Sequence, residues 1–86
     1  MRFVFEVTVS LKDGLLDPQG KAVAEAMPAL GWTNVSEVRI GKSIRLTIDS
    51  EGEAAAERQV NEMASSFLAN PVIERFDVRM LAQEAT

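Results

Sequence analysis

The sequence contains no cysteine and no histidine among its 86 residues. The chain therefore has no thiolate nucleophile, no imidazole base and no disulfide, and it lacks the two side chains that most often bind zinc. These absences exclude most nucleophilic and acid-base catalysis. We expect neither a catalytic residue nor a cofactor or metal site on this chain.

Long apolar runs and an excess of basic residues are absent as well. The first residues alternate between apolar and polar side chains instead of forming the apolar block of a signal peptide. The 13 acidic and 9 basic residues give a formal net charge of −4, whereas affinity for nucleic acid depends largely on clustered Lys and Arg. We therefore expect a cytoplasmic protein that binds neither nucleic acid nor membranes.

The composition that remains is that of one folded domain. Hydrophobic residues make up 47% and charged residues 26% of the chain, as in ordinary soluble globular domains. The length also fits a single small domain. We expect this domain to span residues 1–82 and to be followed by a short frayed tail at residues 83–86.

Four segments have the pattern of β-strands. Residues 3–11 alternate strictly between apolar and polar side chains, which is typical of a strand with one buried face. Residues 35–40 and 44–48 predict two further strands, joined by a hairpin turn at Gly41-Lys42. Residues 72–80 predict a fourth strand.

The first helix is predicted between the first two strands. Asp17 is typical of a helix N-cap and Pro18 of the first helical position. Gly31 is a natural terminator. Pro28 deletes a helical hydrogen bond, so the helix either ends near Ala26 or kinks there. The predicted apolar stripe consists of Ala22, Val23, Ala26, Met27 and Leu30.

A second helix is predicted over residues 51–69. Glu51 and Glu53 provide an acidic first turn that suits the positive end of the helix dipole, and Asn70-Pro71 ends the helix. The predicted apolar stripe consists of Ala56, Val60, Met63, Ala64, Phe67 and Leu68.

The order of these elements predicts an α+β fold of the ferredoxin-like type, β-α-β-β-α-β. This plan is an antiparallel four-stranded sheet with both helices on one face. The opposite face would then be polar and free of the aromatic residues with which ferredoxin-like RNA-binding domains stack bases. Its predicted members are Glu6, Thr8, Glu37, Arg39, Arg45, Thr47, Arg75, Asp77 and Arg79.

Local sequence motifs give little evidence for a binding or catalytic site. Gly41-Lys42-Ser43 resembles the end of a phosphate-binding loop, but the motif needs a glycine where this chain has Ser36. Gly41 is more simply explained as a turn residue with a positive φ. Gly20 in the first helical turn indicates a close approach by another group, either from this chain or from a partner. Trp32 covers the helix end or anchors a partner.

Four segments together resemble the PurS family, the small subunit of phosphoribosylformylglycinamidine synthase. They are residues 7–12 (VTVSLK), 16–20 (LDPQG), 38–42 (VRIGK) and 68–74 (LANPVIE), in this order along the chain. The resemblance covers essentially the whole length. Each fragment alone is weak, but their combination is specific.

The resemblance implies a non-catalytic role in de novo purine (IMP) biosynthesis. In that family the small subunit bridges an ATP-dependent synthetase subunit and a glutaminase subunit that supplies ammonia. ATP and Mg²⁺ would bind to the synthetase, and no cofactor would bind to this chain. The resemblance also implies a homodimer or a higher homo-oligomer.

Three groups of residues are predicted to contact partner chains, although each also has a structural explanation. They are Asp17, Gln19 and Gly20 at the start of the first helix, Arg39, Gly41 and Lys42 at the predicted hairpin, and Asn70, Pro71 and Glu74 after the second helix. The competing hypothesis is a regulatory module of the ACT type, which shares the β-α-β-β-α-β plan and binds small molecules. Gly14 would then lie in the ligand-binding loop after the first strand.

Overall fold

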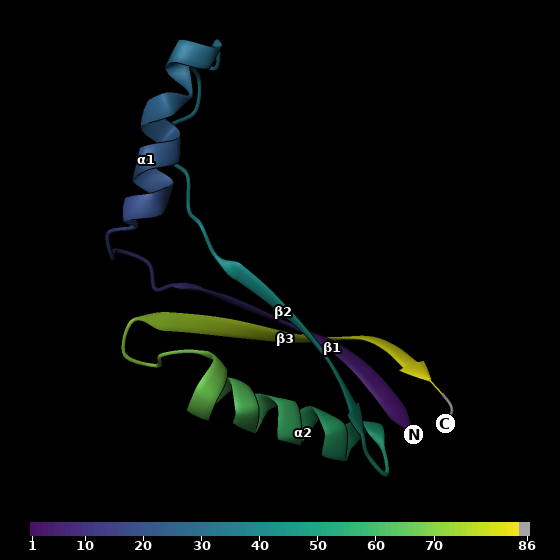
Figure 1. Cartoon of the computed structure of the whole chain (residues 1–86). Helices are drawn as coiled ribbons and strands as arrows, with labels where there is room; N and C mark the ends of the chain where they lie inside the picture. Colours follow the sequence, from purple (N-terminus) through teal and green to yellow (C-terminus); the bar gives the residue numbers. More distant parts are fainter. Residues whose placement is uncertain (85–86) are drawn as a thin grey trace.

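β1 (Arg2–Leu11) is the central strand of a three-stranded antiparallel sheet in the order β2-β1-β3 (Figure 1). The structure is a computed structural model that describes residues 1–84. After β1 the chain forms α1 (Pro18–Ala26), the short 3-10 helix η1 (Pro28–Leu30), β2 (Lys42–Asp49), α2 (Glu53–Met63), the π-helical turn η2 (Ala64–Leu68) and β3 (Glu74–Glu84).

The core forms on one face of β1, as its alternating sequence predicts. Phe3, Phe5, Val7 and Val9 are at most 2% exposed. α2 lies across this face and contacts mainly β1 and β3, with Val60 fully buried. Each such side chain contributes roughly 1.5–3 kcal/mol by leaving water. The predicted strand at residues 3–11 is therefore confirmed, and the sheet with α2 is the stable body of the chain.

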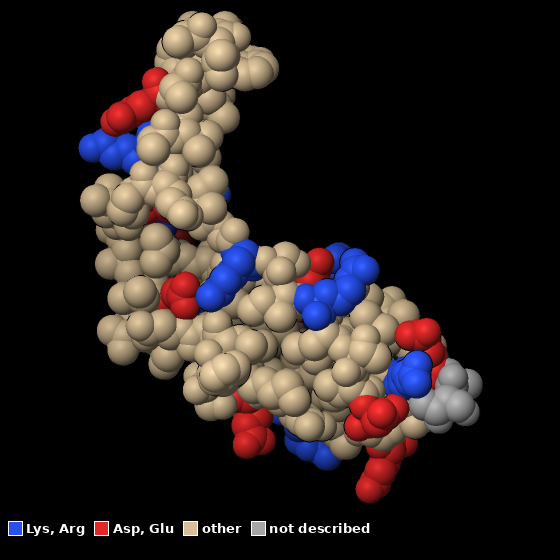
Figure 2. All heavy atoms as spheres, in the orientation of Figure 1, with Lys and Arg blue, Asp and Glu red and all other residues tan. Residues whose placement is uncertain are grey.

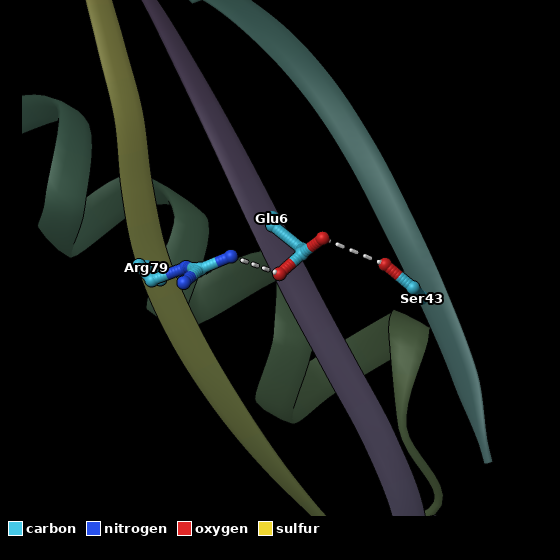
Figure 3. A network of polar contacts seen from close by, with 3 residues as sticks. All are labelled: Glu6, Ser43 and Arg79. Atoms are coloured by element: carbon cyan, nitrogen blue, oxygen red, sulfur yellow. Dashed lines mark hydrogen bonds and ion pairs between the residues drawn. The ribbon is translucent and has the colours of Figure 1, made fainter.

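The other face of the sheet is polar, as predicted for its strand residues. At its centre the Glu6 carboxylate accepts hydrogen bonds from Ser43 Oγ on β2 at 3.1 Å and from Arg79 Nη2 on β3 at 2.9 Å (Figure 3). One carboxylate on β1 thus connects all three strands. Glu37 and Arg39, also predicted on this face, lie outside the sheet because their segment is not one of its strands.

The segment between Asp17 and Gly41 leaves the sheet and projects away from it (Figure 1). We call residues 17–41 the arm. It contains α1, η1 and an extended stretch that runs into β2. The radius of gyration is 16.8 Å, whereas a compact domain of this length would have about 12 Å. The predicted helix is confirmed, but within one chain it does not lie on the sheet beside α2.

The predicted strand at residues 35–40 and its hairpin are not formed, so the sheet has three strands where four were predicted. A two-residue hairpin needs positive φ angles in its turn. Among the described residues only Gly14 and Gly31 have positive φ. Gly41 is instead needed for space, because a Cβ there would lie 2.7 Å from the carbonyl oxygen of Val9. The interpretation of Gly41 as a turn residue is therefore wrong.

The ends of the helices follow the local signals in the sequence. α1 ends at Ala26, and Pro28 starts η1. Gly31, with φ at 103°, ends η1 in the left-handed region. α2 and η2 together occupy residues 53–68, close to the predicted 51–69.

The last strand is longer than its apolar pattern predicts. β3 begins at Glu74 rather than at residue 72 and extends to Glu84, because Gln83 pairs with Phe3 and Glu84 with Arg2. These two residues belong to the predicted tail at 83–86. Residues 85–86 lie outside the described part of the chain.

Candidate partner interface

The base of the arm is fixed by the side chain of Asp17, the N-cap of α1. Its Oδ1 accepts a hydrogen bond from Gly20 N at 2.8 Å, as predicted for an N-cap. Its Oδ2 accepts a second one from Ile40 N at 2.7 Å. Asp17 is only 6% exposed. One carboxylate therefore joins the start of α1 to the end of the arm, directly before β2.

Two further contacts reinforce this junction. Arg39 donates from Nη1 to the carbonyl oxygen of Leu15 at 2.7 Å and from Nη2 to that of Lys12 at 3.3 Å. Gly20 packs so closely that a Cβ there would overlap the carbonyl oxygen of Val38. The close approach predicted at Gly20 thus comes from this chain. We call Asp17, Gly20 and Arg39 the clasp.

Hydrogen bonding lowers the pKa of the Asp17 carboxyl below its ordinary value. The bond from Gly20 N has the largest effect, that from Ile40 N the next, and the charge of Arg39 acts in the same direction, whereas desolvation opposes them. All three favourable contacts stabilise the ionised form.

Asp17→Asn is expected to lower the melting temperature at pH 7, because the two backbone N–H groups bind different carboxylate oxygens and the amide places an NH2 donor opposite one of them. A carboxyl whose pKa is lower in the folded state stabilises the protein above its unfolded pKa, about 3.9, and loses this effect as the pH falls through the folded value. The difference from the original chain should therefore shrink below about pH 4.

Thermal unfolding between pH 3 and pH 7 measures this difference. Asp13→Asn is the matched control, because Asp13 is exposed and no side-chain hydrogen bond is found for it in residues 1–84. A constant difference across this pH range would contradict the role given to the Asp17 charge.

A cleft of about 320 Å³ lies beside the clasp, between the end of β1 and the start of β2. Five of the nine residues predicted to contact partners line it: Asp17, Gln19, Gly41, Lys42 and Glu74. Gly20 is buried next to Asp17. Arg39 lines a second cleft, of about 500 Å³, together with Gly14. The structure thus brings the first two predicted groups together.

The third predicted group forms the loop before β3. Glu74 Oε1 accepts from Asn70 N at 2.7 Å, and the carbonyl oxygen of Asn70 accepts from Glu74 N at 2.7 Å. Pro71 is exposed in this loop. Lys12 N donates to the carbonyl oxygen of Ile73 at 2.9 Å. The loop is therefore tied to the same end of β1 as the clasp.

The sequence did not predict how much apolar surface is exposed. Phe67 was placed on the apolar stripe of the second helix, but it is 85% exposed, because the π-helical turn η2 changes the helical phase. Trp32 is 56% exposed and does not form a buried cap. Leu16, Leu30 and Val72 are 70%, 67% and 76% exposed. These exposed apolar side chains are available for contacts with other chains.

The residues and the fold point to one family. The sequence profile of PurS, described as phosphoribosylformylglycinamidine (FGAM) synthase, matches residues 4–82. The chain belongs to the PurS family. Its curated relatives include the phosphoribosylformylglycinamidine synthase subunit PurS of Bacillus subtilis, with 44% identity over 71 residues, or 83% of each chain. The corresponding subunit of Synechocystis is 42% identical over 78 residues, which are 91% of this chain and 78% of the relative.

Solved PurS structures agree with the fold. A chain in the structure of PurLQS from Thermotoga maritima is 30% identical and superimposes with a TM-score of 0.87 over 94% of this chain and 99% of the other. The relatives named here are PurS subunits, so the alternative of an ACT-type module gains no support. In residues 1–84 no helix of the PurS chain is long and apolar enough to cross a membrane.

Proposed function

We propose that this protein is the PurS subunit of a phosphoribosylformylglycinamidine synthase, and that it bridges a synthetase and a glutaminase subunit without catalysing a step. The observation that carries the proposal is the match to a chain of PurLQS, over almost the full length of both chains. The lack of Cys and His agrees with it, since a glutaminase nucleophile must then come from another chain.

A bridging subunit contributes to the reaction by holding its partner subunits in place. Ammonia released from glutamine would diffuse away or be protonated unless the two active sites are held together, and docking raises its local concentration and limits exposure to water. ATP and Mg²⁺ bind to the synthetase subunit in this proposal.

Partner contacts are assigned to the residues around the clasp and to the loop before β3. These are the clasp residues Asp17, Gly20 and Arg39 with the nearby Gln19, Gly41 and Lys42, and Asn70, Pro71 and Glu74 in the loop. The exposed side chains of Phe67 and Val72 extend the loop surface. The guanidinium of Arg39 also donates two hydrogen bonds to backbone carbonyl oxygens of its own chain.

The subunit acts as a homodimer or a higher homo-oligomer in the cytoplasm. Its single chain has an arm that leaves apolar residues exposed, which a domain of this size can hardly sustain alone. The predicted four-stranded ferredoxin-like arrangement belongs to the same proposal, with a fourth strand and a helix beside α2 supplied on assembly.

Co-purification of the tagged full chain from its own host tests the proposed function. Both a synthetase and a glutaminase subunit should be recovered with it. The purified chain alone should neither hydrolyse glutamine nor consume ATP, whereas the recovered complex should couple both reactions. Recovery of neither subunit, or turnover by the pure chain above that of a mock preparation, would contradict the proposal.

A further inference from the structure

The face of the sheet opposite α2 is covered by no helix of residues 1–84. α2 packs on the apolar face, where Val60 joins the core, and α1 projects away with the arm. We call the uncovered surface the polar face. Side chains alternate along each strand. The strand register therefore places on this face the charged residues Arg2 and Glu6 of β1, Arg45 and Asp49 of β2, and Arg75, Asp77 and Arg79 of β3.

The polar face differs in charge from the rest of the chain. Its four arginines and three carboxylates give a formal charge of +1, whereas the whole chain has −4, so the remaining residues carry −5. On the other side of the sheet, α2 has Glu53, Glu57 and Glu62 against Arg58 alone. In Figure 2 basic side chains lie along the side of the body turned away from α2, and several acidic ones lie on the α2 side.

Two arginines of the polar face have donors that the chain does not use. Glu6 is the register partner of both Arg45 on β2 and Arg79 on β3. Its carboxylate forms an ion pair with Arg79 at 2.9 Å, and its other oxygen accepts from β2 (Figure 3). Within residues 1–84 the side chain of Arg45 has no hydrogen bond or ion pair. Arg75 has one long contact, from Nε to Ser10 Oγ at 3.4 Å.

The type of cation indicates the type of group that it binds. All the cations of the polar face are arginines, and none is a lysine. A planar guanidinium binds a carboxylate through two parallel hydrogen bonds, which an ammonium group cannot do. Arginine is also enriched in protein interfaces, whereas lysine is depleted there. The polar face therefore suits carboxylates on the surface of another protein.

A nucleic acid would fit this face poorly. Glu6 and Asp77 lie among the arginines and would repel a continuous phosphate backbone. The aromatic residues of the strands, Phe3, Phe5 and Phe76, belong to the core side, so they cannot stack with bases on the polar face. A predominantly acidic protein surface also has donors for the two carboxylates.

The position of the polar face fits a subunit with two partners. Arg45 and Arg79 flank the middle of β1, whereas the clasp and the loop before β3 lie at its Leu11 end. A subunit that holds two different partners needs a separate surface for each. The polar face provides the second surface.

We infer that the polar face docks an acidic surface of one partner subunit, whose carboxylates bind to Arg45 and Arg75. The clasp and the loop before β3 then contact the other partner. This inference rests on the proposed function and deepens it, because it assigns the two partners to two different surfaces. Attraction between the opposite charges also speeds the encounter at low ionic strength.

The combined change Arg45→Ala and Arg75→Ala tests the docking. It keeps the pair of Glu6 with Arg79, and exposed charges contribute little to folding, so the melting temperature should be unchanged. Affinities for the separately purified synthetase and glutaminase subunits are measured at about 50 and about 300 mM salt. The affinity for one of the two should fall about tenfold at the lower concentration, and its salt dependence should become weaker.

Arg58→Glu is the matched control. It lowers the formal net charge by two, as the double variant does, but Arg58 is an exposed residue of α2 on the other side of the sheet. Its affinities for both subunits should equal those of the original chain. A loss as large as that of the double variant would attribute the effect to overall charge and overturn the inference.

The remaining outcomes separate the inference from the proposed function. If the double variant binds both subunits as well as the original chain does, or loses affinity for both alike, the inference is overturned and the proposed function stands. If the original chain binds neither subunit, alone or as a mixture, the proposed function fails and the inference fails with it.

Discussion

Phe5→Ala is expected to destabilise the protein by about 3–5 kcal/mol, the usual cost of removing a buried phenylalanine. Phe5 is 1% exposed and lies on the central strand, with Leu46 and Met80 as its register partners on the two neighbouring strands. Its removal leaves a cavity beneath α2 that the sheet cannot fill. Total stabilities of small domains are about 5–15 kcal/mol, so the variant should be close to unfolding.

Phe67→Ala is the matched control, because the same atoms are removed from a side chain that is 85% exposed. Its stability should change by no more than about 0.5 kcal/mol. Urea denaturation at one fixed protein concentration measures both variants, since self-association makes the midpoint depend on concentration. Equal losses in the two variants would show that the core is not where the burial of β1 places it.

Gly20→Ala is expected to destabilise the protein by about 1–3 kcal/mol, as overpacking usually does. The sign of this stability change is informative, because alanine is the better helix former by up to about 1 kcal/mol and would stabilise an unobstructed helix. Here the added Cβ overlaps the carbonyl oxygen of Val38, so the arm must shift and the contact of Asp17 with Ile40 must weaken.

Gly52→Ser controls for the addition of a side chain at a glycine. A Cβ at Gly52 meets nothing within 4 Å, and its φ of −163° is open to any residue. Serine is also a favoured N-cap, so stability should be unchanged or slightly higher. Thermal unfolding of both variants gives the comparison, and a higher melting temperature for Gly20→Ala would rule out the close packing at the clasp.

The parts of the fold that depend on nearby sequence were predictable. The alternation in residues 3–11 identified β1, and Asp17-Pro18 identified the start of α1. Both signals act within a few residues. The second hydrogen bond of Asp17 was not predictable, because its donor, Ile40 N, lies 23 residues away. The sequence therefore predicted the N-cap role of Asp17 but not the clasp.

The hairpin prediction failed for a related reason. The apolar alternation at residues 35–40 indicates that the segment can pair as a strand, but it does not identify the strand with which it pairs. Similarly, the stripe on α1 indicates a buried face without naming the surface that buries it. In both cases the missing information lies outside the segment. Phe67 was placed on the apolar stripe of the second helix although it is exposed, because the spacing of apolar residues gives no sign of a π-helical turn.

The position of β1 in the chain has a consequence for how the protein folds. β1 comes first, whereas both strands that flank it come later, and β3 is the last element. Both of its strand pairs are distant in sequence, so a long loop must close before either pair forms, and folding should be slow for a chain of this size. During synthesis both backbone edges of β1 stay unpaired and its apolar face stays uncovered until β2, α2 and then β3 have emerged. Shielding of this strand from other nascent chains thus becomes a condition for producing the subunit in soluble form.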